Sequence, residues 1–183
     1  MNDRRIQIVD ATLGLVQEEG LAGLTQPRVA KRLGLRQSHV TYYFPTRGDL
    51  LAAVAEHAVL RRIAALAAVL RARTLHGRVA ALAEVLIDPE QTRVLLALTQ
   101  IADRTPALRT HFRALGVGVA APAAALLVSA GADPSPEALL LLQTASTGMA
   151  VVSLSAGLTD QKALEAQLLH LLAALPRAQK DLS

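Results

Sequence analysis

One short stretch of the sequence gathers side chains that can contact a nucleic acid. Residues 34–51 read GLRQSHVTYYFPTRGDLL and contain Tyr42, Tyr43 and Phe44, which are three of the four aromatic residues of the chain; Phe112 is the fourth. Glutamine, histidine and threonine side chains can form hydrogen bonds with base edges. Tyrosine hydroxyls can form them with phosphate oxygens. The stretch therefore has the chemistry of a DNA contact.

A helix over residues 37–44 divides these side chains between two faces. Val40 and Phe44 are four positions apart, so they point inward together. The polar and tyrosine side chains cover the rest of the surface, where lysine and glutamate would serve better if only solubility mattered. We assign Phe44 to the core and Tyr42 and Tyr43 to the DNA backbone. The alternative interpretation is that all three rings fill the core of a small domain.

The elements that must position this stretch are short helices. Apolar residues recur every three or four positions from Ile6 to Val16, and Gly20 ends this first helix. Thr25 caps a second helix, which Gly34 ends. A helix, a tight turn with glycine and a second short helix form a helix-turn-helix, and the second helix of such a motif lies in the DNA major groove.

The remainder of the chain also predicts helices only. Thr46 and Asp49 resemble a capping box and open a long helix that we expect to reach about Arg73. Later starts share a cap, often followed by proline and an acid; they are Asp88-Pro89-Glu90, Thr105-Pro106, Ser135-Pro136-Glu137 and Thr159-Asp160. Pro176 closes the last helix. We therefore predict an all-α fold of about nine helices with no strand.

Composition excludes several classes of protein. Hydrophobic residues make up 52% and charged residues 19%, which is not the composition of a disordered chain. The absence of cysteine excludes disulfides and thiolate metal sites. The net charge of +4 is unevenly spread, with +5 in residues 1–110 and −1 in residues 111–183, and a basic amino-terminal part suits a polyanionic partner. Five arginines are interpreted as a solvated helix face, with pairing to acids as the alternative; they are Arg61, Arg62, Arg71, Arg73 and Arg78.

Two stretches raise the question of a membrane. Residues 114–132 and 138–159 contain no charged residue, and each is long enough to span a bilayer. Neither has Trp or Tyr at its edges, where membrane helices carry aromatic belts. We therefore expect them to be buried in a helical bundle or a subunit interface, with a transmembrane pair as the alternative. The amino terminus lacks the apolar segment of a signal peptide, so we expect a cytoplasmic protein.

The sequence shows no constellation typical of an enzyme. The five histidines never fall three or four positions apart, as ligands on one helix face would. The run GVGVAA at residues 116–121 has the letters of a dinucleotide-binding fingerprint, but no strand is predicted before it. Ser129 and Ser155 lack a nucleophile elbow. We expect no enzyme activity, no cofactor and no metal.

The run LTQPRVAKRLGLRQSHVTYYFPTRGDLL resembles the DNA-binding domain of the tetracycline-repressor (TetR) family of bacterial regulators. The resemblance covers roughly residues 4–51, where caps, turn glycine and aromatic residues occur at the family's spacing. The rest of the chain is similar in helix number and order only. The resemblance implies a helix-turn-helix DNA-binding domain over residues 1–45 and an effector-binding and dimerisation domain over residues 46–183.

The resemblance also implies which residues touch DNA. They are the phosphate-binding Thr25, Tyr42 and Arg47, the base-reading Gln37, Ser38, His39 and Thr41, Tyr43 at the groove edge, and Gln26 and Arg28 near the backbone. Arg36 stands where the family often has serine, so the recognition helix lacks that cap. A DNA contact and a solvated side chain both remain open for Arg36. Arg47 stands where the family usually has lysine, which keeps the charge and adds a fork geometry.

In this family the carboxyl-terminal helices bind a small effector and form the dimer. Residues 136–156 and 159–175 are accordingly expected to build a four-helix interface between two subunits. The effector pocket is expected among helices of residues 46–131, and the candidates are His57, Arg61, Arg93, Thr99, Gln100, His111, Phe112 and Thr147. Each of these is also explained as a surface or core residue. The scarcity of aromatic residues favours an aliphatic or modest-sized effector.

The function implied by the resemblance is that of a ligand-responsive repressor, acting as a homodimer on a palindromic operator. Its effector would shift the balance between two dimer states that differ in the spacing of the recognition helices. The alternative is a DNA-binding regulator without a small-molecule effector, either constitutive or controlled by a protein partner.

Overall fold

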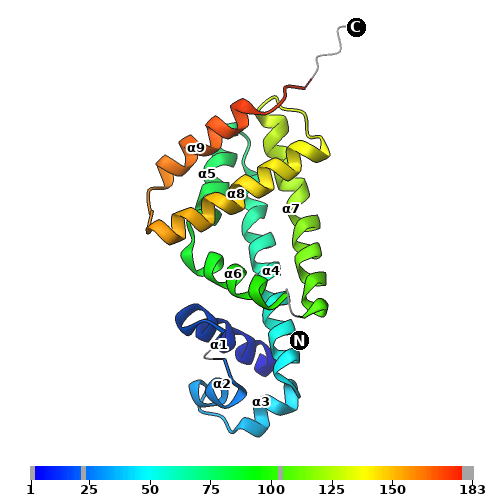
Figure 1. Cartoon of the computed structure of the whole chain (residues 1–183), viewed down its shortest axis with the longest axis vertical. Coiled ribbons are helices and arrows are strands. Elements are labelled where there is room, and N and C mark those ends of the chain that lie inside the picture. Colours follow the sequence, from blue (N-terminus) through cyan, green and yellow to red (C-terminus); the bar gives the residue numbers. More distant parts are fainter. Residues whose placement is uncertain (1–2, 22–23, 103–104, 179–183) are drawn as a thin grey trace. The chain divides into compact units, whose positions relative to one another are not determined.

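The computed structural model describes residues 3–21, 24–102 and 105–178, and every regular element within those ranges is a helix (Figure 1). The helices are α1 (Asp3–Glu19), α2 (Gln26–Arg32), α3 (Gln37–Tyr43), α4 (Arg47–Arg71), α5 (Leu75–Ile87), α6 (Pro89–Ala102), the 3-10 turn η2 (Pro106–Leu108), α7 (Arg109–Ser129), α8 (Pro136–Ala156) and α9 (Gln161–Ala174). This confirms the all-α fold and the number of α-helices expected from the sequence.

Most helix ends follow the predicted local chemistry. Gly20, directly after α1, has the left-handed φ of 68° that glycine adopts without strain. The Ser135 side chain caps α8 by accepting a hydrogen bond from the Ala138 backbone N–H at 3.3 Å. Asp160 caps α9, as the Thr159-Asp160 pair predicted. One expectation was wrong in part: Thr105 makes no side-chain cap and precedes only the 3-10 turn.

The chain packs into two compact units. The first comprises residues 1–61 and 93–114, and the second comprises residues 62–92 and 115–183. Helices α4, α6 and α7 therefore each contribute residues to both units. The division expected from the sequence, between residues 45 and 46, separates functions and not packing units, and it stays a prediction.

The first unit has a core that joins its short helices to the start of α4. The largest apolar side chains in this core are almost completely buried; they include Ile8, Leu24, Val29, Val40, Phe44, Leu50, Val54 and Leu98. Helix α2 packs against both α1 and α3. The short helices thus share one core with the long helix that follows them, which fixes the helix-turn-helix on a larger support.

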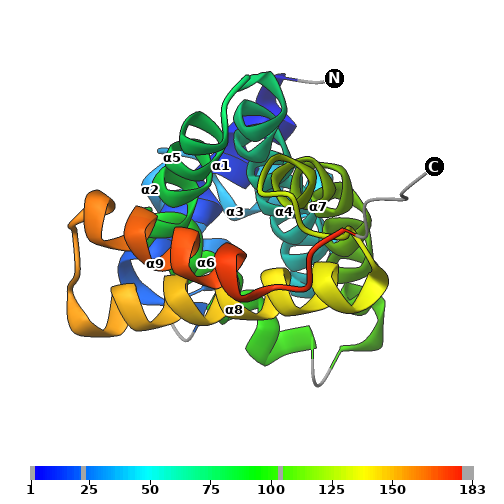
Figure 2. The same ribbon diagram turned by 90° about the horizontal axis from the view of Figure 1, so that it is seen from above.

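The second unit has a separate core made almost entirely of aliphatic side chains. Helix α5 packs against both α8 and α9, and α8 and α9 lie side by side (Figures 1 and 2). The buried residues include Leu66, Val69, Val79, Ala83, Leu86, Leu127, Leu142, Leu164, Leu168 and Leu172. After α9 the chain returns to the end of α7, where Asp133 N donates to Pro176 O at 3.1 Å.

The expectation of a solvated arginine face was wrong at two positions. Arg62 is only 8% exposed. Arg78 is half-buried and donates to the backbone carbonyls of Ala72 and Ala125, which joins α5 to α7. Arg61, Arg71 and Arg73 are exposed, as predicted.

Helices α7 and α8 correspond to the two charge-free stretches. By length and composition alone both could cross a membrane, a test that the core helix of a soluble protein also passes. Each also leaves apolar side chains on the surface, with Val117 78% exposed on α7 and Leu140 64% exposed on α8. Burial within one chain therefore accounts for only one face of each helix.

Gly118 permits a close approach between α7 and α4. A Cβ at this position would lie 2.4 Å from Ile63 Cδ1 and 2.6 Å from Ile63 Cγ1. A Cβ at Gly116, two residues earlier on the same helix, would meet no packing neighbour within 4 Å. The two glycines therefore lie in the same helix but differ in packing, because a side chain would meet Ile63 at Gly118 and no neighbour at Gly116.

We predict opposite effects of alanine at these two glycines. Gly116→Ala should raise the free energy of unfolding by about 0.5–1 kcal/mol, because alanine is the better helix former. Gly118→Ala gains the same propensity but must displace Ile63, and overpacking typically costs about 1–3 kcal/mol. Urea unfolding followed by circular dichroism measures both changes. Equal stabilisation of the two variants would contradict the tight contact.

Candidate nucleic-acid interface

Helix α3 is held to the first unit by its inner face. Val40 is fully buried, and Phe44, directly after the helix, is 1% exposed. The guanidinium of Arg5 lies 5.2 Å from the centroid of the Phe44 ring, a cation–π contact that braces the same ring from α1. The assignment of Phe44 to the core is confirmed.

The turn between α2 and α3 depends on Gly34. This residue has a φ of 65°, in the left-handed region, and Leu35 N donates to Ala30 O at 2.9 Å. The start of α2 is tied to the end of α3 as well, because Gln26 Nε2 donates to Phe44 O at 2.6 Å. The two helices are therefore held at both ends in a helix-turn-helix.

The outer face of α3 is exposed and carries the residues expected to read bases. Gln37, Ser38 and His39 are exposed, and Tyr42 is 80% exposed, so its ring does not belong to the core. Tyr43 is half-buried against the core of the first unit, and its ring stands edge-on to Tyr42 with centroids 5.1 Å apart. The core interpretation is thus wrong for Tyr42 and partly right for Tyr43.

Two expected contact residues are already engaged with the helical backbone. Thr41 Oγ1 donates to Gln37 O at 3.0 Å within α3. The Thr25 hydroxyl accepts the backbone N–H of Arg28 at 3.4 Å and so caps α2. Arg36 is exposed at the start of α3 and makes no side-chain cap, as predicted.

The arginines of α2 are paired with acids of α1. Arg28 contacts Glu19, and Arg32 binds Glu18 through two hydrogen bonds of 2.7 and 2.6 Å. This fork lowers the pKa of Glu18 and raises that of Arg32, chiefly through the hydrogen bonds between them. Exposed ion pairs add little to stability by themselves. We therefore interpret these pairs as contacts that align α2 on α1.

Arg47 begins α4 and faces the loop after α1. Its Nε donates to Leu24 O at 3.1 Å and its Nη2 donates to Leu21 O at 3.2 Å. A lysine cannot make both bonds from one rigid fork, so arginine at this position has a structural role that the sequence did not indicate. The residue remains largely exposed, with its charge at the surface.

The capping box predicted before α4 is formed. The Asp49 carboxylate accepts from Thr46 N at 2.9 Å and from Thr46 Oγ1 at 2.8 Å, and Asp49 N donates back to Thr46 Oγ1 at 3.1 Å. These hydrogen bonds hold the pKa of Asp49 below its ordinary value. The box fixes the turn by which the chain leaves α3 and enters α4.

The residues expected to line an effector pocket do not converge on one site within either unit. His57 Nε2 lies 3.2 Å from Asp10 Oδ1, and the Thr99 and Thr147 hydroxyls donate to carbonyls one turn earlier on their own helices. Arg61, Arg93 and Gln100 are exposed, and Phe112 packs against the core of the first unit. Thr147 lies in the second unit and the others lie in the first.

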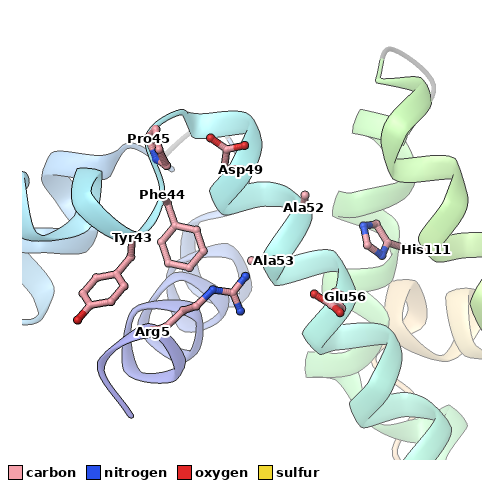
Figure 3. A pocket seen from close by; sticks show the side chains of 9 residues that line it. All are labelled: Arg5, Tyr43, Phe44, Pro45, Asp49, Ala52, Ala53, Glu56 and His111. Atoms are coloured by element: carbon pink, nitrogen blue, oxygen red, sulfur yellow. The ribbon is translucent and has the colours of Figure 1, made fainter. Parts of the chain in front are cut away.

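His111 alone of that set lines a hollow of about 390 Å³ in the first unit (Figure 3). The hollow is bounded by Arg5, Tyr43, Phe44, Pro45, Asp49, Ala52, Ala53, Glu56 and His111. Its walls include the capping carboxylate of Asp49 and the ring of Phe44, which are residues that hold α3 and the turn into α4 in place.

Sequence reasoning missed Arg62, whose burial is unusual for a charged side chain. On α4 the buried positions Ala55, Val59, Arg62, Leu66 and Val69 follow one another at intervals of three or four. This stripe was readable in the sequence, and it separates Arg62 from the exposed Arg61.

An all-α chain with a helix-turn-helix, whose second helix exposes glutamine, serine, histidine and tyrosine, defines the class of DNA-binding regulators. Comparison with known proteins adds a family match for the amino-terminal part of the chain. Residues 8–54 match the model of the family described as bacterial regulatory proteins, tetR family.

Two of the similar curated relatives are regulators named BetI. The chain is 41% identical to the HTH-type transcriptional regulator BetI of Burkholderia lata over 78 residues, which cover 43% of this chain and 36% of the relative. It is 43% identical to BetI of Paraburkholderia phytofirmans over 58 residues, which cover 32% and 29%. The matched region thus spans about a third of the length of these relatives.

Solved structures are similar over nearly the whole chain. A transcriptional regulator from Rhodococcus sp. Rha1 has a TM-score of 0.80 and 23% identity, with 93% of this chain and 95% of that chain covered. A TetR transcription regulator from Haloarcula marismortui has a TM-score of 0.80 and 22% identity, covering 96% and 99%. The multidrug binding protein EbrR, complexed with imidazole, has a TM-score of 0.68 and 27% identity, covering 98% and 99%. Residues 8–54 thus match the DNA-binding part of TetR-family regulators, and the fold of the whole chain is similar to that of solved transcriptional regulators, one of which is titled a TetR regulator.

We predict that the capping box of α4 makes the stability of the protein depend on pH, with a loss of stability in acid. Because the Asp49 pKa is lowered in the folded state, its contribution is complete above the ordinary aspartate pKa of about 3.9 and is lost as the pH falls through the lower folded value. Asp49→Asn should therefore lower the melting temperature at neutral pH. The gap to the wild type should close in acid, where both side chains are uncharged.

Thermal unfolding followed by circular dichroism at a series of pH values tests this. Glu84→Gln, an exposed carboxyl in the middle of α5, is the control and should track the wild type throughout. A gap for Asp49→Asn that persists unchanged in acid would show that the carboxylate charge does not hold the cap.

Proposed function

We propose that this protein is a cytoplasmic, ligand-responsive repressor that binds a palindromic operator as a homodimer. The observation that carries the proposal is the outer face of α3, where residues with base-reading side chains are exposed together on a helix held firmly from behind. Gln37 and His39 can bond base edges, and Tyr42 can reach a phosphate.

The positive charge available to DNA sits beside this face. Arg36 at the start of α3 and Arg47 at the start of α4 are both exposed. In the helix-turn-helix docking mode, base edges are read from the recognition helix while neighbouring residues bind phosphates. We assign Gln37, Ser38 and His39 to bases, and Arg36, Tyr42 and Arg47 to phosphates.

Dimerisation is proposed through the outward faces of α8 and α9. Leu140, Leu141 and Val152 are exposed on α8, although their neighbour Leu142 is buried. A Cβ at Gly148 would meet no packing neighbour within 4 Å, so this face has room for a second helix to approach. A second copy of the same pair of helices completes a four-helix interface and covers the apolar surface.

Response to a small effector is proposed from one similar solved protein. EbrR is a multidrug binding protein whose structures contain imidazole or proflavin, and it is similar to this chain over nearly its full length. The alternative is a regulator that has no small-molecule effector, either constitutive or controlled by a protein partner. Persistent operator binding in the presence of every tested small molecule would favour that alternative.

We predict that the double variant Gln37→Ala, His39→Ala loses sequence preference. Footprinting on the DNA that flanks the gene should show a two-fold symmetric protected site for the wild type, because the dimer places two recognition helices about 34–36 Å apart. Each lost base contact typically costs about 1–3 kcal/mol, so the variant should approach non-specific affinity. Gln100→Ala, an exposed residue on α6, is the control.

A salt titration separates base contacts from phosphate contacts. The double variant should keep the steep salt dependence of the wild type, since its phosphate contacts are intact. Unchanged sequence preference in the double variant would exclude α3 as the reading helix. If the flanking DNA shows no protected site, selection from genomic fragments with both proteins makes the same comparison.

We predict that Leu141→Glu, Val152→Glu dissociates the dimer. A buried carboxylate pair facing its own copy is destabilising, so the dissociation constant should rise at least about tenfold. Analytical ultracentrifugation measures it. Val117→Glu, also apolar and exposed but on α7, is the control and should leave the dimer intact. A monomeric wild type, or a dimer unaffected by the double variant, would overturn the proposed interface.

A further inference from the structure

Arg62 stands out in the second unit as a buried cation. It is 8% exposed, and its Nη1 atom is inaccessible to solvent and has no hydrogen-bond partner among the described residues. Among the described residues, no carboxylate lies within ion-pair distance of the Arg62 guanidinium. Buried charges are normally paired, because removal of a charge from water costs several kcal/mol otherwise. An unpaired buried guanidinium therefore points to an anion that binds there.

Other unsatisfied groups lie at the junction of α5 and α6. Gln91 Oε1 and Thr92 Oγ1 are inaccessible to solvent and also lack hydrogen-bond partners, and Thr92 is 1% exposed. Asp88 belongs to the same turn, where its Oδ2 accepts from Gln91 Nε2 at 2.7 Å. Burial lowers the pKa of Arg62 and the charge of Asp88 partly opposes this, so the junction and the guanidinium are electrostatic neighbours.

These groups define the chemistry of a ligand. A guanidinium fork matches the two oxygens of a carboxylate, and the Thr92 hydroxyl can donate a further hydrogen bond. The nearby Asp88 carboxylate disfavours more than one added negative charge, which argues against a phosphate dianion. The buried residues that precede and follow the site on α4 and α5, such as Leu66, Val85 and Leu86, are aliphatic.

We propose that Arg62 anchors a binding site for the carboxylate of a small aliphatic acid, and that this acid is the effector of the regulator. The second clause rests on the proposed function; the first does not. The bound carboxylate would compensate the buried charge of Arg62 and so stabilise the conformation that binds the acid. The acid can alter DNA binding only by favouring that conformation over the other.

The experiment uses the full-length protein without DNA and a series of straight-chain acids from butanoate to decanoate. Isothermal titration calorimetry and thermal unfolding are measured for the wild type, Arg62→Met and Arg61→Met. The last is a matched control, since Arg61 is the exposed neighbour on the same helix. Hexanamide, which has the shape of hexanoate without its charge, is the control ligand.

The expected result has two parts. Acids bind the wild type and Arg61→Met, bind Arg62→Met at least about tenfold more weakly, and hexanamide binds none of them comparably. Without ligand, Arg62→Met melts about 2–4 °C higher than the wild type, because a buried unpaired charge has been replaced by an apolar side chain of similar length. Arg62→Lys, which keeps the charge but not the fork, should bind acids with intermediate strength.

Three results would overturn the proposal. They are the absence of acid binding to the wild type at millimolar concentration, equal binding to Arg62→Met, and a lower melting temperature of unliganded Arg62→Met, which would show that Arg62 supports the fold. The operator footprint is measured separately. If the acid binds but no operator is protected, the carboxylate site is supported and the proposed regulator function is contradicted. If an operator is protected but no acid binds, only the carboxylate site is contradicted.

Discussion

Seven residues are too few to form a stable helix in isolation, so α3 depends entirely on what lies behind it. The burial of Val40 and Phe44 supplies that support. The Gln26 amide then fixes the carbonyl of Phe44, and the capping box of Thr46 and Asp49 turns the chain into α4. Each of these contacts is made on the inner side of α3. The side chains on its outer face are therefore not needed to hold the helix in place and can contact DNA.

Charge in the first unit is largely used for assembly. Arg28 and Arg32 hold α2 to α1 through Glu19 and Glu18, and Arg47 holds carbonyls of the preceding loop. These side chains lie at the surface, so DNA phosphates would have to compete with the acids or share the guanidinium groups. Association with DNA would then weaken the α1–α2 ion pairs while it strengthens the protein–phosphate contacts, an exchange that costs little because exposed pairs contribute little.

Local rules predicted the fold well because helix ends are determined by a few adjacent residues. Gly20, Gly34 and the Thr46–Asp49 box needed only a φ value or a hydrogen bond three residues away, and each formed as expected. The failures had a different cause. Arg62 was grouped with the solvated arginines by its charge, although its spacing from Val59 and Leu66 places it on the buried face of α4.

The candidate DNA-binding residues illustrate the same division. Exposure of Gln37, His39 and Tyr42 followed from the helical phase of Val40 and Phe44, so the sequence was sufficient. The second role of Arg47 was not predictable, because it depends on carbonyls 23 and 26 positions earlier in the chain. Apart from Phe112, the effector candidates were chosen by polarity, and the hydrogen bonds of Thr99 and Thr147 to their own helices account for those two polar residues.

The aromatic poverty of the chain has a spectroscopic consequence. There is no tryptophan, and the two tyrosines, Tyr42 and Tyr43, are adjacent on α3. Tyrosine emission from the native protein therefore originates solely in this helix, from one ring in solvent and one against the core. The unlabelled protein therefore carries its own optical reporter on the surface proposed to face DNA, and quenching of that emission would register events at α3 without interference from the rest of the molecule.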